Sequence, residues 1–213
     1  MFNLPSKTIV NKTLPKNVFH GYASAKLKRQ LTDKIEKIIW TNKISPGTIN
    51  LSGKEIEEIQ IFTIKLKERE EVPELLTLFD KAIPYHIIFT VAYNDDYYIS
   101  TSKKHKHPTN NDQAVIDWTF KTGWFNANSF HLVLNLKNNL DAIYEDLCFQ
   151  ISGYEEKPKQ NIDALIEKEQ KIKHLNNQIQ KLQTQIKKCK QFNKKVSLNI
   201  ELEQIEKQLK EIR

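Results

Sequence analysis

The chain has 213 residues, of which 39% are hydrophobic, 33 are basic and 26 are acidic. This length predicts one compact domain of about 150 residues with an extension, and no apolar run approaches the roughly 18 residues of a membrane-spanning helix. Residues 1–5 lack the pattern of a secretory signal peptide, and the two cysteines match no zinc or redox spacing. We therefore expect a cytoplasmic protein without a metal ion or other cofactor.

The excess of positive charge is confined to the C-terminal quarter of the chain. Residues 157–213 contain 14 basic and 7 acidic residues, whereas residues 1–156 contain 19 of each. A neutral domain joined to a basic arm is typical of a protein that binds a polyanion or an acidic protein surface. The alternative is that the lysines only keep the outside of a coiled coil in solution.

Residues 24–40 have the apolar spacing of an amphipathic helix. Leu27, Leu31, Ile35 and Ile38 recur every three or four residues, with basic residues between them. The preceding segment contains two prolines and is expected to be irregular or extended, because the residue before a proline disfavours the helical conformation.

Sequence typical of strands follows. Residues 48–51 predict a short strand, and residues 58–67 predict a longer one that is apolar on both faces, as inner strands are. Residues 73–82 predict a helix with a proline in its first turn. Residues 86–93 and 97–102 are rich in β-branched and aromatic residues and predict two strands joined by a hairpin turn.

The remainder of the predicted domain contains one more strand and one more helix. Residues 103–112 are polar and predict a loop, residues 115–121 predict a strand, and residues 136–151 predict a helix. The element order, α-β-β-α-β-β-β-α, favours an α+β domain over residues 1–152, with a largely antiparallel sheet and flanking helices. Residues 153–158 predict a linker.

Apolar residues then repeat at heptad spacing, and the repeat changes phase once. Ile172, Ile179 and Ile186 lie seven apart, whereas the later seam is shifted by two residues and consists of Leu198, Leu202, Ile205, Leu209 and Ile212. The shift predicts a reversal, so we expect a basic antiparallel helical hairpin (coiled coil) over 159–213, with arms of about 30 and 15 residues. Asn199 is the expected cap of the second arm. A parallel dimer is the alternative, and a homodimer held by two hairpins stays open.

Five lysines and one aromatic residue cluster where the hairpin is expected to reverse: Lys187, Lys188, Lys190, Phe192, Lys194 and Lys195. We expect this cluster to bind nucleic acid or a protein partner. The lysines could neutralise phosphates, and a base could stack on Phe192. The alternative is that the lysines are only solvated. For Phe192 we expect a structural role, in which Phe192 and Val196 plug the end of the hairpin. Lysine without arginine favours phosphate contact over the reading of base edges.

A metal-dependent nuclease is the less favoured interpretation. Glu55, Glu57 and Glu58 precede the second predicted strand, and Lys65 lies on it. Thr63 begins the triplet that ends at Lys65, where restriction-like nucleases have a metal-binding carboxylate. Without this oxygen ligand the site would bind Mg²⁺ poorly. We therefore expect solvated charges here and assign no catalytic residue.

Four stretches of the chain resemble one family: residues 2–5 (FNLP), 10–12 (VNK), 83–85 (IPY) and 190–196 (KQFNKKV). They are similar to the prokaryotic domain-of-unknown-function family 4391 over nearly the whole chain. Members are often encoded beside superfamily 2 helicases and DNA methyltransferases of restriction-like, anti-phage systems. The resemblance implies an accessory subunit of a DNA-processing defence system. We expect a non-catalytic accessory or adaptor subunit whose basic hairpin binds a protein partner, a helicase or DNA methyltransferase subunit, with DNA as a further partner. It transfers no active-site residue.

Overall fold

A computed structural model of the chain describes residues 2–129, 131–153 and 161–212, without the side chains of residues 106 and 110–113. The chain divides into two compact units, residues 1–156 (the α+β unit) and residues 157–213 (the hairpin unit). Most of the predicted linker, from residue 154 onward, lies outside the described residues.

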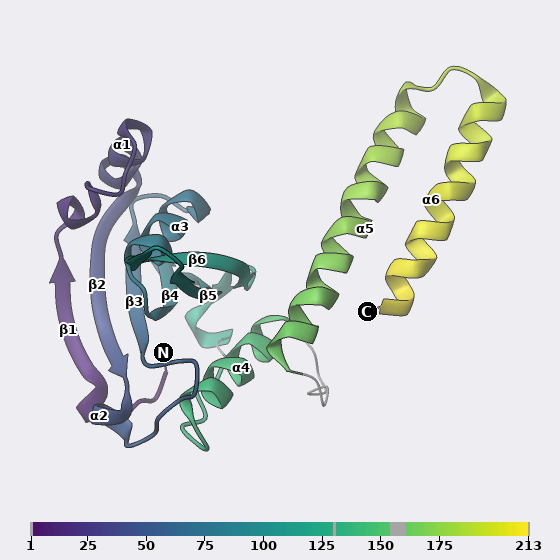
Figure 1. Cartoon of the computed structure of the whole chain (residues 1–213). Helices are drawn as coiled ribbons and strands as arrows, with labels where there is room; N and C mark the ends of the chain where they lie inside the picture. The colour runs from purple at the N-terminus through teal and green to yellow at the C-terminus, as the bar shows by residue number, and fades with distance from the viewer. Residues whose placement is uncertain (1, 130, 154–160, 213) are drawn as a thin grey trace. The chain divides into compact units, whose positions relative to one another are not determined.

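Six strands lie side by side in chain order in the α+β unit (Figure 1). They are β1 (Ile9–Leu14), β2 (Ile35–Ile44), β3 (Ile59–Leu66), β4 (His86–Tyr93), β5 (Asp96–His107) and β6 (Asn110–Lys121), and the short β7 (Phe125–Asn126) pairs with β5. Only β3 and β4 are parallel, and the other pairings are antiparallel. The predicted α+β fold with a largely antiparallel sheet is therefore confirmed.

Helices cover both faces of this sheet. α1 (Ala25–Lys34) and α3 (Pro73–Ala82) contribute to the main apolar core on one face, and α4 (Leu140–Ile151) contacts the opposite face. A short helix, α2 (Pro46–Ile49), and three 3-10 turns lie in the connections; the turns are Ser6–Thr8, Lys16–Phe19 and Ala127–Ser129.

The core follows the two-residue period of the central strands. Alternate residues of β3 and β4 are buried in the cluster that includes α1 and α3; they are Phe62, Ile64, Leu66, Ile87, Phe89 and Val91. On the other face the hydroxyl groups of Tyr144 and Thr101 lie 3.0 Å apart, and the ring of His86 packs edge-on to Tyr144. This alternation explains why the sequence of β3 is apolar on both faces.

The helix predicted over 24–40 is too long, because the chain enters β2 at Ile35. A bulge between Ile35 and Lys37 shifts the register of β2 against β3. The extra residue lets Ile35 and Ile38, three positions apart, both enter the core. A bulged strand thus reproduces the three-residue spacing that usually indicates a helix.

Two further expectations for this unit are wrong. The strand predicted over 48–51 is replaced by α2, which begins with a capping box between Ser45 and Thr48 and ends at Asn50 in the left-handed conformation. The polar loop predicted over 103–112 consists largely of the paired ends of β5 and β6. One of the polar residues in these strands, Lys104, is buried in an ion pair.

The hairpin unit contains two packed helices, α5 (Ile162–Lys188) and α6 (Phe192–Ile212), which run side by side in opposite directions (Figure 1). Their buried seam consists of Leu175, Leu182, Ile205 and Leu209, with Ile172, Ile179, Leu198, Leu202 and Ile212 partly buried against it. The predicted helical hairpin is confirmed. The second arm is longer than expected, and Asn199 is not its cap, because its side chain donates to the Lys195 carbonyl within α6.

Candidate nucleic-acid interface

The end of the hairpin unit is formed by a tight reversal between α5 and α6. Lys188 is the last residue of α5, and Phe192 is the first of α6. The Cys189 amide donates to the Ile186 carbonyl at 3.3 Å, and the Lys195 amide donates to the Gln191 carbonyl at 3.0 Å. We call Lys187, Lys188, Lys190, Phe192, Lys194 and Lys195 the tip cluster, since this short connection holds all six at one end of the hairpin.

Phe192 does not plug the hairpin. Its side chain is 78% exposed, and that of Val196 is 43% exposed. Neither belongs to the seam, whose buried residue closest in sequence to the reversal on α5 is Leu182. The three-residue connection closes while both apolar side chains stay in solvent. The expected structural role for Phe192 and Val196 is therefore wrong.

The five lysines of the tip cluster are all exposed. No acidic residue occurs in the sequence between Glu169 and Glu201, and the ion pairs found in the described part of the chain involve none of these lysines. Lys187 and Lys188 lie in the last turn of α5, where the helix dipole favours positive charge. The cluster therefore presents ammonium groups and one aromatic ring to solvent.

Glu58 and Lys65, which the nuclease interpretation requires in one site, do not lie together. The Glu58 carboxylate is buried, pairs with the ammonium of Lys43 at 2.6 Å and accepts a hydrogen bond from Gln60 at 2.6 Å. Lys65 is exposed seven positions further on, about 23 Å along extended chain and on the opposite strand face. The expectation that Glu58 is solvated is therefore wrong. Glu58 also does not share a site with Lys65.

A buried polar cluster lies under α3, and it was not predicted from the sequence. Lys104 of β5 donates to the Asp80 carboxylate at 2.9 Å and to the carbonyl of Ile83 at 2.8 Å. The Ser102 hydroxyl donates to the other Asp80 oxygen at 2.7 Å. A pocket of about 110 Å³ lies beside the cluster. Every donor of Lys104 contacts the end of α3, so the cluster fastens this helix to the sheet.

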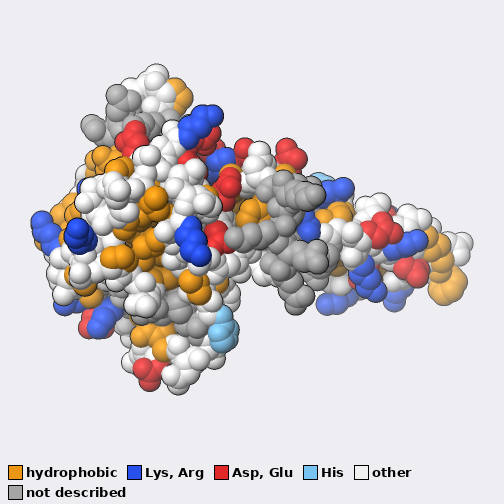
Figure 2. All heavy atoms as spheres, turned by 90° about the horizontal axis from the view of Figure 1, so that it is seen from below, with side chains coloured by type: hydrophobic (Ala, Val, Ile, Leu, Met, Phe, Trp, Pro, Cys, Tyr) orange, Lys and Arg blue, Asp and Glu red, His pale blue; other side chains and the backbone are white. Residues whose placement is uncertain are grey.

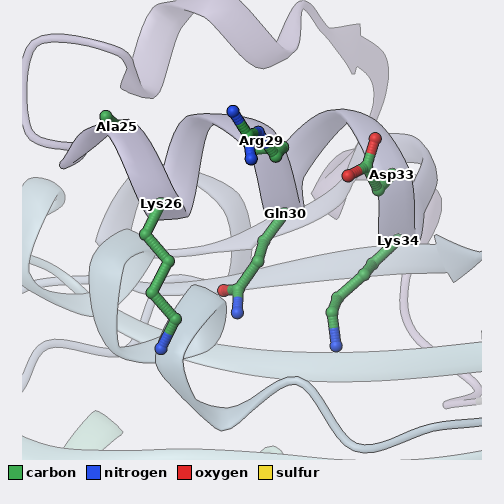
Figure 3. A pocket seen from close by; sticks show the side chains of 6 residues that line it. All are labelled: Ala25, Lys26, Arg29, Gln30, Asp33 and Lys34. Atoms are coloured by element: carbon green, nitrogen blue, oxygen red, sulfur yellow. The ribbon is translucent and has the colours of Figure 1, made fainter.

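The outer surface of α1 carries a hollow of about 380 Å³, lined by Ala25, Lys26, Arg29, Gln30, Asp33 and Lys34. Figure 3 shows Lys26, Gln30 and Lys34 pointing to one side of the helix. Lys26 pairs with Glu74 at 2.9 Å and Lys34 pairs with Glu70. The hydrogen bond from Lys26 lowers the pKa of the Glu74 carboxyl. Lys26 and Lys34 are therefore paired with acidic side chains, unlike the lysines of the tip cluster.

Charge elsewhere on the α+β unit is mixed. Lys and Arg side chains lie scattered over the face seen in Figure 2, with acidic side chains among them. Within the described residues, no group of three or more His, Cys, Asp or Glu side chains is placed to hold a metal ion. The helices in the same residues are too short or too polar to cross a membrane.

A family profile described as "Domain of unknown function (DUF4391)" matches residues 2–209. No protein of curated function and no solved structure matches the chain significantly. The profile extends over nearly all of the α+β unit and the hairpin unit, so the resemblance carried by four short stretches is confirmed. The chain belongs to the DUF4391 family.

Proposed function

We propose that this protein is a non-catalytic accessory subunit of a nucleic-acid-processing assembly and that the tip cluster contacts the phosphate backbone. The observation that carries this proposal is the exposure of five lysines around one reversal, without a carboxylate among them. Clustered ammonium groups repel one another, and a polyanion relieves this repulsion while releasing its counterions. Flexible lysines grip phosphates as point charges and do not select base sequence.

The α+β unit would hold the protein component of the assembly. Its mixed charge (Figure 2) makes it a weaker candidate for a polyanion than the hairpin unit. The family resemblance implies a neighbouring helicase or DNA methyltransferase, and we propose a subunit of one of these enzymes as the partner, in an anti-phage system that acts in the cytoplasm.

A salt titration of nucleic-acid binding by the full-length protein tests the phosphate contact. Each contact adds about −0.9 to the slope of log K against log salt on duplex DNA. Replacing all five tip lysines with glutamine should therefore flatten the slope by up to about 4.5 and abolish binding at physiological salt.

The matched control removes five exposed lysines of the same hairpin unit that lie away from the tip. These are Lys171, Lys173, Lys181, Lys207 and Lys210. Both variants have the same net charge, so a loss confined to the tip variant assigns the contact to the tip cluster. Equal losses would indicate a diffuse charge effect, and no binding at low salt would overturn the proposal.

Co-purification tests the protein contact. A chain shortened to residues 1–156 should keep the helicase or methyltransferase subunit and lose nucleic acid. Loss of the enzyme subunit, with the circular dichroism of the shortened chain intact, would instead place protein docking on the hairpin unit.

A further inference from the structure

We infer that the tip cluster binds single-stranded nucleic acid, with an unpaired base stacked on Phe192 and the neighbouring phosphates held by lysines. This inference rests on the proposed function and specifies which form of nucleic acid is bound. Duplex DNA offers phosphates but keeps its base faces covered, whereas a single strand offers both.

The side chain of Phe192 lies on the face of α6 turned away from the seam. Phe192, Val196 and Ile200 follow one another at four-residue spacing, which places them on one side of a helix. Val196 and the seam residue Leu198 are two positions apart, or about 200° around the helix axis. All three outer residues are exposed, by 78%, 43% and 53%. The outer face of α6 therefore carries an apolar strip that α5 cannot cover.

The composition around this strip indicates its ligand. Lys194 and Lys195 lie within the first turn of α6, and that turn contains no acidic residue. A ligand that contacts both features combines an apolar surface with closely spaced negative charge. Single-stranded nucleic acid has this combination, since every base has an apolar face and every linkage a phosphate. Val196 and Ile200 extend the apolar strip along the helix for the adjoining bases and sugars.

An anionic membrane is the main competitor, because it also attracts lysines and apolar side chains. A helix that lies in a membrane surface needs a continuous apolar face along its length. Here the strip ends at Ile200, and the next positions on that face are Glu203 and Gln204. The short strip and the charge that follows it favour a strand over a lipid surface.

The test compares full-length variants by fluorescence anisotropy with a labelled oligo-dT strand and with a labelled duplex of equal length. Phe192→Ala and Phe192→Leu should weaken binding to the single strand about tenfold or more and leave duplex binding unchanged. Phe192→Trp should restore single-strand binding, and its added tryptophan fluorescence should be quenched by the strand.

Three outcomes would overturn the inference. Equal affinities of Phe192→Leu and the wild-type protein for the single strand would show that no base stacks there. Equal losses on single strand and duplex would make Phe192 a structural residue of the tip. Binding to vesicles containing anionic phosphatidylserine, but not to oligo-dT, would identify a lipid ligand. In the first two outcomes, a loss of binding in the variant without the five tip lysines would still support the proposed function. No nucleic-acid binding by the wild-type protein would overturn both the inference and the proposed function.

Discussion

The ammonium nitrogen of Lys104 lies 2.9 Å from a carboxylate oxygen of Asp80, and these side chains are 0% and 3% exposed. The same nitrogen donates to the backbone carbonyls of Asp80 and Ile83. Burial lowers the pKa of Lys104 and raises the pKa of Asp80, while their attraction opposes both shifts. Each of these two buried charges is therefore stabilised by the other.

Lys104→Met should destabilise the α+β unit by about 3–5 kcal/mol, because it leaves the Asp80 carboxylate buried without its cation. Urea unfolding at pH 7 measures this loss. Lys121→Met is the control, since Lys121 pairs with Glu71 at the surface, where the side chains are 44% and 42% exposed. The control should cost less than about 1 kcal/mol. Similar losses in the two variants would contradict a special role for the buried pair.

The Asp141 carboxylate fastens the segment before β3 to α4. It accepts hydrogen bonds from the backbone amides of Lys54, Glu55 and Ile56 at 2.5, 3.1 and 2.9 Å. Burial raises the pKa of Asp141, but these three bonds outweigh burial and hold the pKa below its ordinary value. The resulting stability is present above pH about 3.9 and is lost as the pH falls through the folded pKa.

Asp141→Asn should therefore cost about 2 kcal/mol or more at neutral pH, and the difference from wild type should shrink below pH about 4. Hydrogen exchange of the three amides provides a local measurement and should become faster. Asp33→Asn, at an exposed position of α1, is the control. Unchanged exchange of the three amides in Asp141→Asn would contradict this role.

His86 should make stability depend on pH. Burial first, and the charge of Lys104 second, lower its pKa to about 3. The unfolded chain protonates this histidine near pH 6.5 and the folded one does not. Stability from His86 is therefore full above pH about 6.5 and falls as the pH drops toward 3, by up to about 1.4 kcal/mol per pH unit.

His86→Phe keeps a ring against Tyr144 but removes the titrating group. The urea midpoint of this variant should therefore depend less on pH between pH 7 and pH 5 than that of the wild-type protein. His105→Phe, which removes a histidine that is 55% exposed, is the control for the loss of one imidazole. A wild-type protein whose midpoint does not change over this range would contradict the prediction.

The stability of the hairpin unit should fall when seam residues are substituted and should change little when residues on its outer face are substituted. Leu182→Ala creates a cavity between α5 and α6 and should destabilise their packing by about 2–4 kcal/mol. Ile200→Ala, at a position that is 53% exposed, should change it by less than about 0.5 kcal/mol. Hydrogen exchange of the amides of α5 and α6 measures the effect of each substitution. Comparable effects would indicate that another surface covers Ile200.

The fold class, the reversal and most strands of this protein are readable from its sequence, because they follow from periodicity and turn residues. The start of β2 is not, since a bulge gives Ile35 and Ile38 helical spacing. Nor is the pair of Asp80 and Lys104, which lie 24 positions apart and meet only through the packing of α3 on β5. A lone lysine in polar sequence carries no sign of burial.

The tip cluster was predicted as a group, but the exposure of Phe192 was not. Sequence spacing shows which residues lie near a reversal, and it does not show how many residues the reversal takes. Spacing also does not show whether an aromatic side chain at the start of α6 is enclosed or left in solvent. Here the connection is three residues long, and Phe192 is left in solvent.

The length of α5 sets a molecular distance. Its 27 residues, at 1.5 Å each, span about 40 Å between Ile162 and the tip cluster. Forty ångströms correspond to about twelve base pairs of duplex at 3.4 Å each. A strand held at the tip would thus lie about one helical turn of DNA from whatever is bound at the start of α5, near Ile162.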